Sequence, residues 1–152
     1  MYPTLLWGNN AAGFQYYSTL YLPNSDLEGY IGYLPSDNSI YVVFRGSSSL
    51  NDWIANMTVT MTPYTSYPGC ADCQVQEDWY TMEQNIISQV SQDVFDLLWM
   101  HPTAAVKTTG HNLGAALATL TAMDLAHDYD GVSCYNYGSP RVGNAAFSAF
   151  VG

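Results

Sequence analysis

The chain has 152 residues, of which 48% are hydrophobic and 11% charged, a balance typical of one globular domain with a buried core. Thirteen acidic residues against three basic ones give a net charge of −10, which argues against nucleic acid and anionic membranes as partners. A neutral substrate or a neutral lipid surface is compatible with this charge. No apolar run reaches the length of about 18 residues that a transmembrane helix needs, and MYPTLLWGNN does not resemble a signal peptide.

The first third of the chain predicts strands. Residues 13–22, 28–34 and 39–45 mix aromatic and β-branched side chains, which is typical of strands. The second and third of these segments are separated by Pro35-Ser36-Asp37-Asn38, whose residue types favour a tight turn. We therefore expect a hairpin over residues 28–45.

A short helix is predicted over residues 49–57, SLNDWIANM. Its apolar side chains recur at i, i+3, i+4 and i+7, which is the spacing of one helix face. These side chains are Leu50, Trp53, Ile54 and Met57. On the residues alone, the simpler interpretation is an ordinary helix that faces the core.

The second half of the chain alternates between helices and strands. A long helix is predicted from Glu77 to the residues before Pro102, with acidic residues at its N-terminus. Its apolar stripe consists of Trp79, Met82, Ile86, Val90, Val94 and Leu97. The elements that follow are a strand at 103–110, a helix at 113–126, a strand at 132–138 and a helical pattern at 144–151. This order predicts right-handed βαβ units on a parallel sheet behind an antiparallel hairpin, and thus an α/β fold.

Three cysteines bear on the chemistry of the chain. Cys70 and Cys73 form a C-x-x-C pattern, for which a local disulfide in a secreted protein is the favoured interpretation. A zinc site would need a second pair, and a redox pair should open a helix directly after a strand. Cys134 lies in an apolar run and is expected to be a buried free thiol. We expect no metal and no cofactor.

The stretch TTGHNLGAALATL, residues 108–120, predicts a strand, a tight turn and a helix of small residues. This is the setting of a nucleophile elbow, in which a strained residue projects above the carboxyl edge of a sheet. Gly110 and Gly114 would leave room for such a turn. The N–H groups at the start of the helix could then stabilise an oxyanion. The central residue, however, is Asn112.

Four segments together resemble the class 3 (fungal-type) triacylglycerol lipase family of the α/β-hydrolase superfamily. GHNLGAALATL resembles the family's elbow, and YVVFRGSSSLNDWIANM resembles a strand followed by the lid helix. PGCADCQVQEDWY resembles the disulfide loop, and YNYGSPRVGNAAFSAFV a later signature. The resemblance implies an α/β-hydrolase-type, mostly parallel sheet with flanking helices. We expect one lipase-like domain over 1–152 that is incomplete at both ends.

The resemblance also assigns roles to individual residues. Asn112 matches the position of the nucleophile, and Ser47 and Leu113 match the oxyanion hole. His111 belongs to the elbow and is expected to be structural. With the resemblance, the helix formed around Leu50, Trp53, Ile54 and Met57 is expected to be a lid. Arg141 and Asn144 match a turn held by hydrogen bonds.

The sequence departs from the family in three respects. Asn112 cannot act as a nucleophile, because its amide nitrogen is neither basic nor activated by a neighbouring histidine. The triad acid and base of the family fall beyond residue 152, and His101 and His127 are in the wrong places to replace them. Residues 76–79 replace the H-x-G-F motif of the family. The N-terminal helix that is usual in the family is also absent.

These observations lead to an expected function and its alternatives. We expect a secreted carboxylic ester hydrolase of the lipase family, acting on a neutral lipid or ester at an interface, whose activity is lost or impaired by Asn112. The alternative is a pseudoenzyme that binds lipid or a partner. A third interpretation, deamidation of Asn112 to a nucleophilic Asp, lacks a histidine to activate water. An exposed edge at 132–137 would favour self-association.

Overall fold

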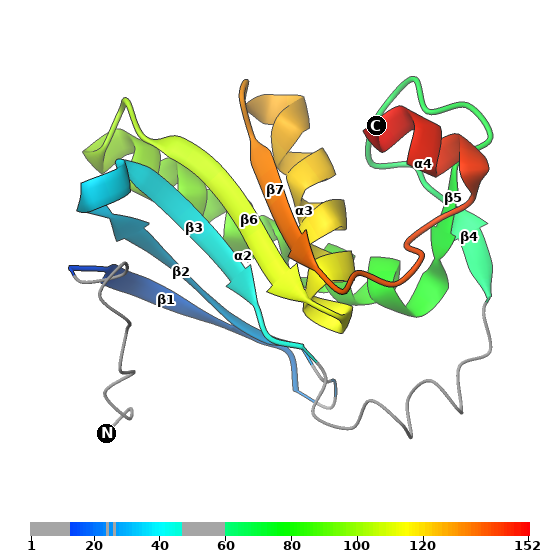
Figure 1. The fold of residues 1–152 in the computed structure, drawn as a ribbon, viewed down its shortest axis with the longest axis horizontal. Helices are drawn as coiled ribbons and strands as arrows, with labels where there is room; N and C mark the ends of the chain where they lie inside the picture. The colour runs from blue at the N-terminus through cyan, green and yellow to red at the C-terminus, as the bar shows by residue number, and fades with distance from the viewer. Residues whose placement is uncertain (1–12, 24, 26, 47–59) are drawn as a thin grey trace.

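The computed structural model describes residues 13–23, 25, 27–46 and 60–152. Its main sheet has five strands in the order β1-β2-β3-β6-β7 (Figure 1). The strands are β1 Gln15–Tyr21, β2 Glu28–Leu34, β3 Ser39–Phe44, β6 Ala105–His111 and β7 Ser133–Tyr137. The helices are α2 Glu77–Met100, α3 Leu113–Asp128 and α4 Ala145–Val151.

The sheet is mixed. Strands β1, β2 and β3 pair antiparallel, whereas β3, β6 and β7 pair parallel. The turn between β2 and β3 is a single 3-10 turn, Pro35–Asp37, followed by Asn38 in the left-handed conformation (φ 44°, ψ 50°). The expected antiparallel hairpin in front of parallel βαβ units, and with it the α/β class, is confirmed.

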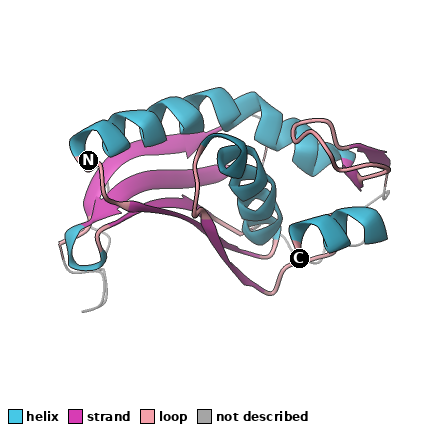
Figure 2. Ribbon diagram, turned by 90° about the horizontal axis from the view of Figure 1, so that it is seen from above, coloured by secondary structure: helices cyan, strands magenta, loops and turns pink. Residues whose placement is uncertain are grey.

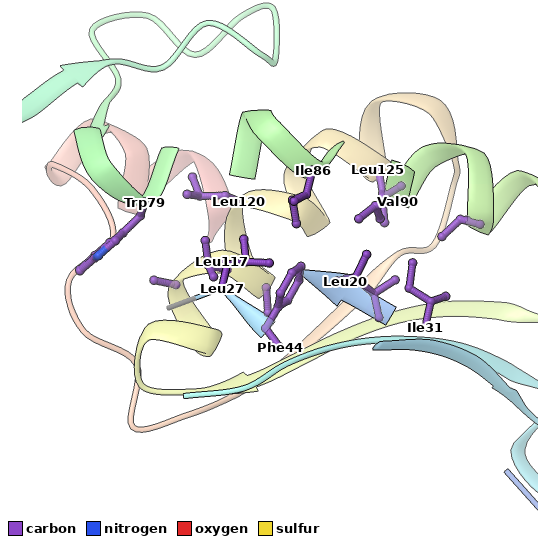
Figure 3. Close-up of a cluster of buried hydrophobic side chains, with 14 of the residues drawn as sticks. Leu20, Leu27, Ile31, Phe44, Trp79, Ile86, Val90, Leu117, Leu120 and Leu125 are labelled. Atoms are coloured by element: carbon purple, nitrogen blue, oxygen red, sulfur yellow. The ribbon is translucent and has the colours of Figure 1, made fainter. Parts of the chain in front are cut away.

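Both long helices cover the same face of the sheet (Figures 1 and 2). Because β3-α2-β6 and β6-α3-β7 are right-handed crossovers in one direction, their helices must lie on one side. The core between helices and sheet is apolar, as Figure 3 shows. Its largest members include Leu20, Ile31, Phe44, Trp79, Leu117, Leu120 and Leu125. The apolar stripe of α2 is buried as expected, except that Met82 is only partly buried and Glu83 takes the buried position.

Two short strands form a separate hairpin that the sequence did not reveal. Strands β4 Met61–Pro63 and β5 Gln74–Gln76 pair antiparallel, in a region expected to be a loop. Helix α4 lies beside β5, so that β4, β5 and α4 form one end of the molecule (Figure 1). None of the helices in the described part of the chain is both long and apolar enough to span a bilayer.

The expectation for Cys134 was wrong. Cys134 is free, but it is exposed. It lies on β7, which pairs only with β6 among the described strands, so its apolar sequence neighbourhood does not translate into burial.

Candidate functional site: the turn between β6 and α3

Asn112 lies between the last residue of β6 and the first residue of α3, in a conformation with φ 54° and ψ −119°. Few residues other than glycine adopt such angles, and they do so only where the surrounding structure enforces them. Here the Asn112 N–H donates to the carbonyl of Tyr137 on β7, at 3.0 Å. The Asn112 carbonyl accepts from the N–H groups of Ala115 and Ala116, at 2.9 and 3.2 Å. The turn is therefore fixed on both sides.

The two glycines of the turn occupy positions where a side chain has no room. A Cβ at Gly110 would lie 2.2 Å from the carbonyl group of Gly114. A Cβ at Gly114 would lie 2.4 Å from the carbonyl oxygen of Phe44 on β3. Real Cβ atoms do not approach backbone atoms this closely, so helix α3 can start directly against β3 and β6 only with glycine at both positions.

The side chain of Asn112 turns back onto the start of its own helix. Its Oδ1 accepts a hydrogen bond from the N–H of Leu113 at 2.8 Å. This N–H is one of the unpaired donors at the N-terminus of α3, where the helix dipole favours negative charge. This donor at the start of α3 is thus already occupied by the side chain of Asn112.

The turn lies where the carboxyl ends of the parallel strands meet. Gly46, just after β3, approaches the backbone of His111, and Gly138, just after β7, approaches its ring. The side chain of Leu113, by contrast, is fully buried in the core. In open α/β sheets this edge is the usual location of a ligand site.

The other two histidines lie away from the turn. His101 caps the C-terminus of α2, and its ring stacks on Tyr33 with the centroids 3.7 Å apart. His127 is near the C-terminus of α3, beside Asp128 and Tyr67. Neither ring is within the elbow, so neither is placed to accept a proton there.

Several predicted site residues lie outside the described residues. They are Ser47 and the four apolar positions of the expected lid helix, Leu50, Trp53, Ile54 and Met57. The described chain reaches Gly46 and resumes at Thr60. The oxyanion hole expected at Ser47 and Leu113 and the lid therefore remain predictions.

The cysteine pair and the SPRVGN segment are joined to each other. Cys70 and Cys73 form a disulfide, as predicted, with their Cα atoms 5.5 Å apart. The side chain of Asn144 donates to the carbonyl of Asp72 at 2.8 Å, inside this loop. Its Oδ1 accepts from the N–H of Phe147 and so caps α4. Arg141 donates to the carbonyl of Gly143 at 2.9 Å. These contacts support the structural role expected for Arg141 and Asn144.

One chemically notable residue was missed. Glu83 is a buried carboxyl group on α2, and it was hidden in the sequence by the apolar stripe around it. Its spacing from Trp79 and Ile86, four and three residues away, places it on the same helix face and was the available signal.

Comparisons with known proteins agree with this architecture. The family described as "Lipase (class 3)" matches residues 41–152. A lipase of Rhizomucor miehei is 36% identical over 76% of the chain, and a secreted mono- and diacylglycerol lipase A of Penicillium cyclopium is 34% identical over 84%. The chain spans only 32% and 41% of these two relatives, respectively.

Solved structures give the same result. The Rhizomucor miehei triacylglyceride lipase superposes with a TM-score of 0.83 over 91% of the chain and 53% of that structure, at 29% identity. The lipase from Rhizopus microsporus var. chinensis gives 0.84 over 93% of the chain and 50% of that structure, at 30% identity. The chain thus corresponds to about half of a lipase fold.

Proposed function

Since the chain belongs to the class 3 lipase family, we propose that its β6–α3 turn is the nucleophile elbow of a carboxylic ester hydrolase in which Asn112 prevents the acyl-transfer step. One observation carries this proposal. Asn112 holds the strained backbone conformation of an elbow, but its side chain accepts the Leu113 N–H instead of pointing a nucleophile at a substrate. The shape of the elbow is kept and its reactive group is absent.

The chemistry follows from what a hydroxyl would do at this position. A serine hydroxyl passes its proton to a base as its oxygen attacks an ester carbonyl. The tetrahedral intermediate then breaks its bond to the alcohol, which leaves with that proton, and an acyl-enzyme remains. We assign the stabilisation of that oxyanion to the backbone N–H of Leu113 and to Ser47. The amide nitrogen of Asn112 has its electron pair delocalised into the carbonyl, so it cannot begin this reaction.

Substrate and location follow from the relatives and the charge. A net charge of −10 favours a neutral substrate over an anionic one. Together with the names of the relatives, this supports a neutral lipid or ester bound at an interface, beneath a lid carrying Trp53. The Cys70–Cys73 disulfide and the secreted relative support an extracellular location.

Substitution at position 112 tests the proposal. Asn112→Ser supplies a hydroxyl, and Asn112→Ala is the matched control, because it also removes Oδ1 but supplies no nucleophile. Because the triad acid and base of the family fall beyond residue 152, both substitutions are made in a longer chain that includes those positions. With a short-chain chromogenic ester, we expect hydrolysis by Asn112→Ser above that of Asn112→Ala. Equal rates for the two variants would contradict the assignment of this turn as an ester hydrolase elbow.

A second candidate is a binding protein that uses the lipase scaffold without catalysis. The hydrogen bond from Leu113 to Asn112 favours it, because the elbow satisfies its own donor and is stable without a substrate. In this case the wild-type chain should bind a non-hydrolysable ether analogue of a diacylglycerol in equilibrium dialysis. Retention no greater than that of a heat-denatured sample would exclude this function.

A further inference from the structure

Glu83 is a carboxyl group placed inside the core. It lies on the face of α2 that packs on the rest of the molecule, in line with Trp79 and Ile86, and its exposed fraction is 0%. An ionised carboxylate at such a position loses its hydration and needs a cation or several donors in compensation. The groups around Glu83 therefore determine its protonation state.

A second carboxyl group faces it from the neighbouring helix. Asp124 of α3 accepts from the hydroxyl of Tyr64 at 2.9 Å and from the side-chain amide of Gln84 at 3.1 Å. The same Gln84 amide donates to Oε2 of Glu83 at 2.8 Å and so bridges the two acids. Oε1 of Glu83 is buried and accepts no hydrogen bond from any described group.

No cation among the described residues neutralises this pair. The three basic side chains are engaged elsewhere: Arg45 contacts Glu28, Lys107 contacts Asp37, and Arg141 donates to the carbonyl of Gly143. The titratable side chain that contacts the pair is Tyr64, next to which Tyr80 lies. Burial, and then the charge of Asp124, raises the pKa of the Tyr64 phenol, which therefore stays neutral. Two adjacent buried carboxylates without a cation repel each other, and one bound proton removes that repulsion.

We propose that Glu83 and Asp124 form a proton-binding site, in which Oε1 of Glu83 carries the proton and donates a hydrogen bond to the carboxylate of Asp124, holding α2 against α3. The proton fills the one position that the surrounding donors leave empty. Asp124 keeps its negative charge, which the Tyr64 hydroxyl and the Gln84 amide stabilise. The site thus holds a single charge shared among four side chains.

The acidities of the two groups agree with this arrangement. Burial, and then the negative charge of Asp124, raises the pKa of Glu83 from 4.5 to about 8. Burial also raises the pKa of Asp124, against the hydrogen bonds from Tyr64 and Gln84 that lower it. Between pH 4.5 and about pH 8, the folded chain therefore binds a proton at Glu83 that the unfolded chain does not.

The raised pKa of Glu83 sets the direction in which the stability of the fold depends on pH. A carboxyl group with a raised pKa in the folded state stabilises the fold fully below its unfolded pKa, and this contribution is lost as the pH rises through the folded value. Stability should therefore decrease from about pH 5 to about pH 8, which is opposite to the effect of a salt-bridged carboxylate.

The site also joins the sheet-covering helices to one end of the molecule. Tyr64, which follows β4, packs against Phe147 of α4 with ring centroids 5.2 Å apart. It also contacts Tyr80 of α2 at 5.5 Å. Loss of the proton should therefore loosen the end formed by β4, β5 and α4, which Figure 1 shows beside α2 and α3.

Thermal unfolding of the full chain between about pH 5 and about pH 9 tests the proposal. Glu83→Gln is a neutral mimic of the protonated acid, and Glu77→Gln removes an exposed carboxylate from the same helix as the control. We expect the Tm of the wild type to fall with rising pH, Glu77→Gln to show the same slope, and Glu83→Gln to show a smaller one. A slope for Glu83→Gln equal to that of the wild type would overturn the proposal.

Infrared spectroscopy gives a readout that does not depend on the stability of any variant. At about pH 6.5 exposed carboxyl groups are ionised, so a protonated-carboxyl carbonyl band should come from the buried site. We expect this band in the wild type and in Glu77→Gln, and its loss from the wild type above about pH 9. Absence of the band from the folded wild type at pH 6.5 would also overturn the proposal.

Discussion

Asn112 holds the backbone angles φ 54° and ψ −119° and uses its side chain to cap α3. Asparagine is suited to both tasks, because it tolerates positive φ better than most residues and is a good N-cap. These properties explain how asparagine is stable in this turn. On the proposed function, the turn thereby keeps its backbone geometry without a nucleophile.

Substitutions at Asn112 should separate the contribution of the helix cap from that of the positive φ. Asn112→Ala loses the cap and also the local side-chain hydrogen bond that helps asparagine to tolerate positive φ, which should lower the free energy of unfolding by about 2 kcal/mol. Asn112→Gly loses the cap but relieves the angle, so its loss should be smaller. Urea titration of the three proteins checks the order. An Ala variant as stable as the wild type would show that the turn is not strained.

At the scale of elements, the sequence predicted every long helix and strand that the structure describes. Apolar residues at helical spacing marked α2, a mix of aromatic and β-branched residues marked β1, β2 and β3, and small residues marked α3. Strands β4 and β5 escaped because three residues are too few to show a period of two. The parallel sheet followed from the order of the elements rather than from any single segment.

The site was predictable only in part. The glycines and Asn112 stand in a local pattern, so the tight turn between β6 and α3 could be placed from the sequence. The hydrogen bond from Leu113 to Asn112 depends on a side-chain rotamer, which no local pattern encodes. In the same way, helix packing determines that Glu83 lies opposite Asp124. The prediction that Cys134 is buried was wrong for a similar reason, since the exposure of a strand depends on whether a neighbouring strand is present.

The close approach of α3 to β3 predicts a specific sensitivity to added volume. In Gly114→Ala, the new Cβ would meet the carbonyl oxygen of Phe44, and backbone cannot move aside as a side chain can. We expect a loss of about 3 kcal/mol in the free energy of unfolding. Gly131→Ala is the control, since no atom lies near its Cβ and only its φ of 76° opposes alanine. That control should lose about 1 kcal/mol. Equal losses of unfolding free energy in the two variants would show that α3 can shift away from β3.

At the scale of the whole molecule, the sheet is covered by helices on one face and ends at β7, which has a single partner among the described strands. Tyr135 and Tyr137 on this strand are 51% and 64% exposed. An unprotected edge that carries large apolar side chains is a site for pairing with another chain. The net charge of −10 opposes association, so the balance should depend on salt.

We therefore expect the 152-residue chain to form dimers or larger species in light scattering, more strongly at high salt. Tyr135→Lys should reduce association by adding charge to the edge. Tyr21→Lys, an equally exposed position on the opposite edge strand β1, is the control and should leave the association unchanged. A monomeric wild type at all salt concentrations would count against an accessible β7 edge.

An elbow that has kept its shape without its chemistry requires that Asn112 has no reactivity of its own. The most direct measurement is the initial rate of short-chain chromogenic ester hydrolysis by the purified wild-type chain, compared with the same sample after heat inactivation. We predict that the two rates are equal. A saturable, heat-labile rate above the background, lost in Asn112→Ala, would contradict the claim that this elbow has kept its shape without its chemistry.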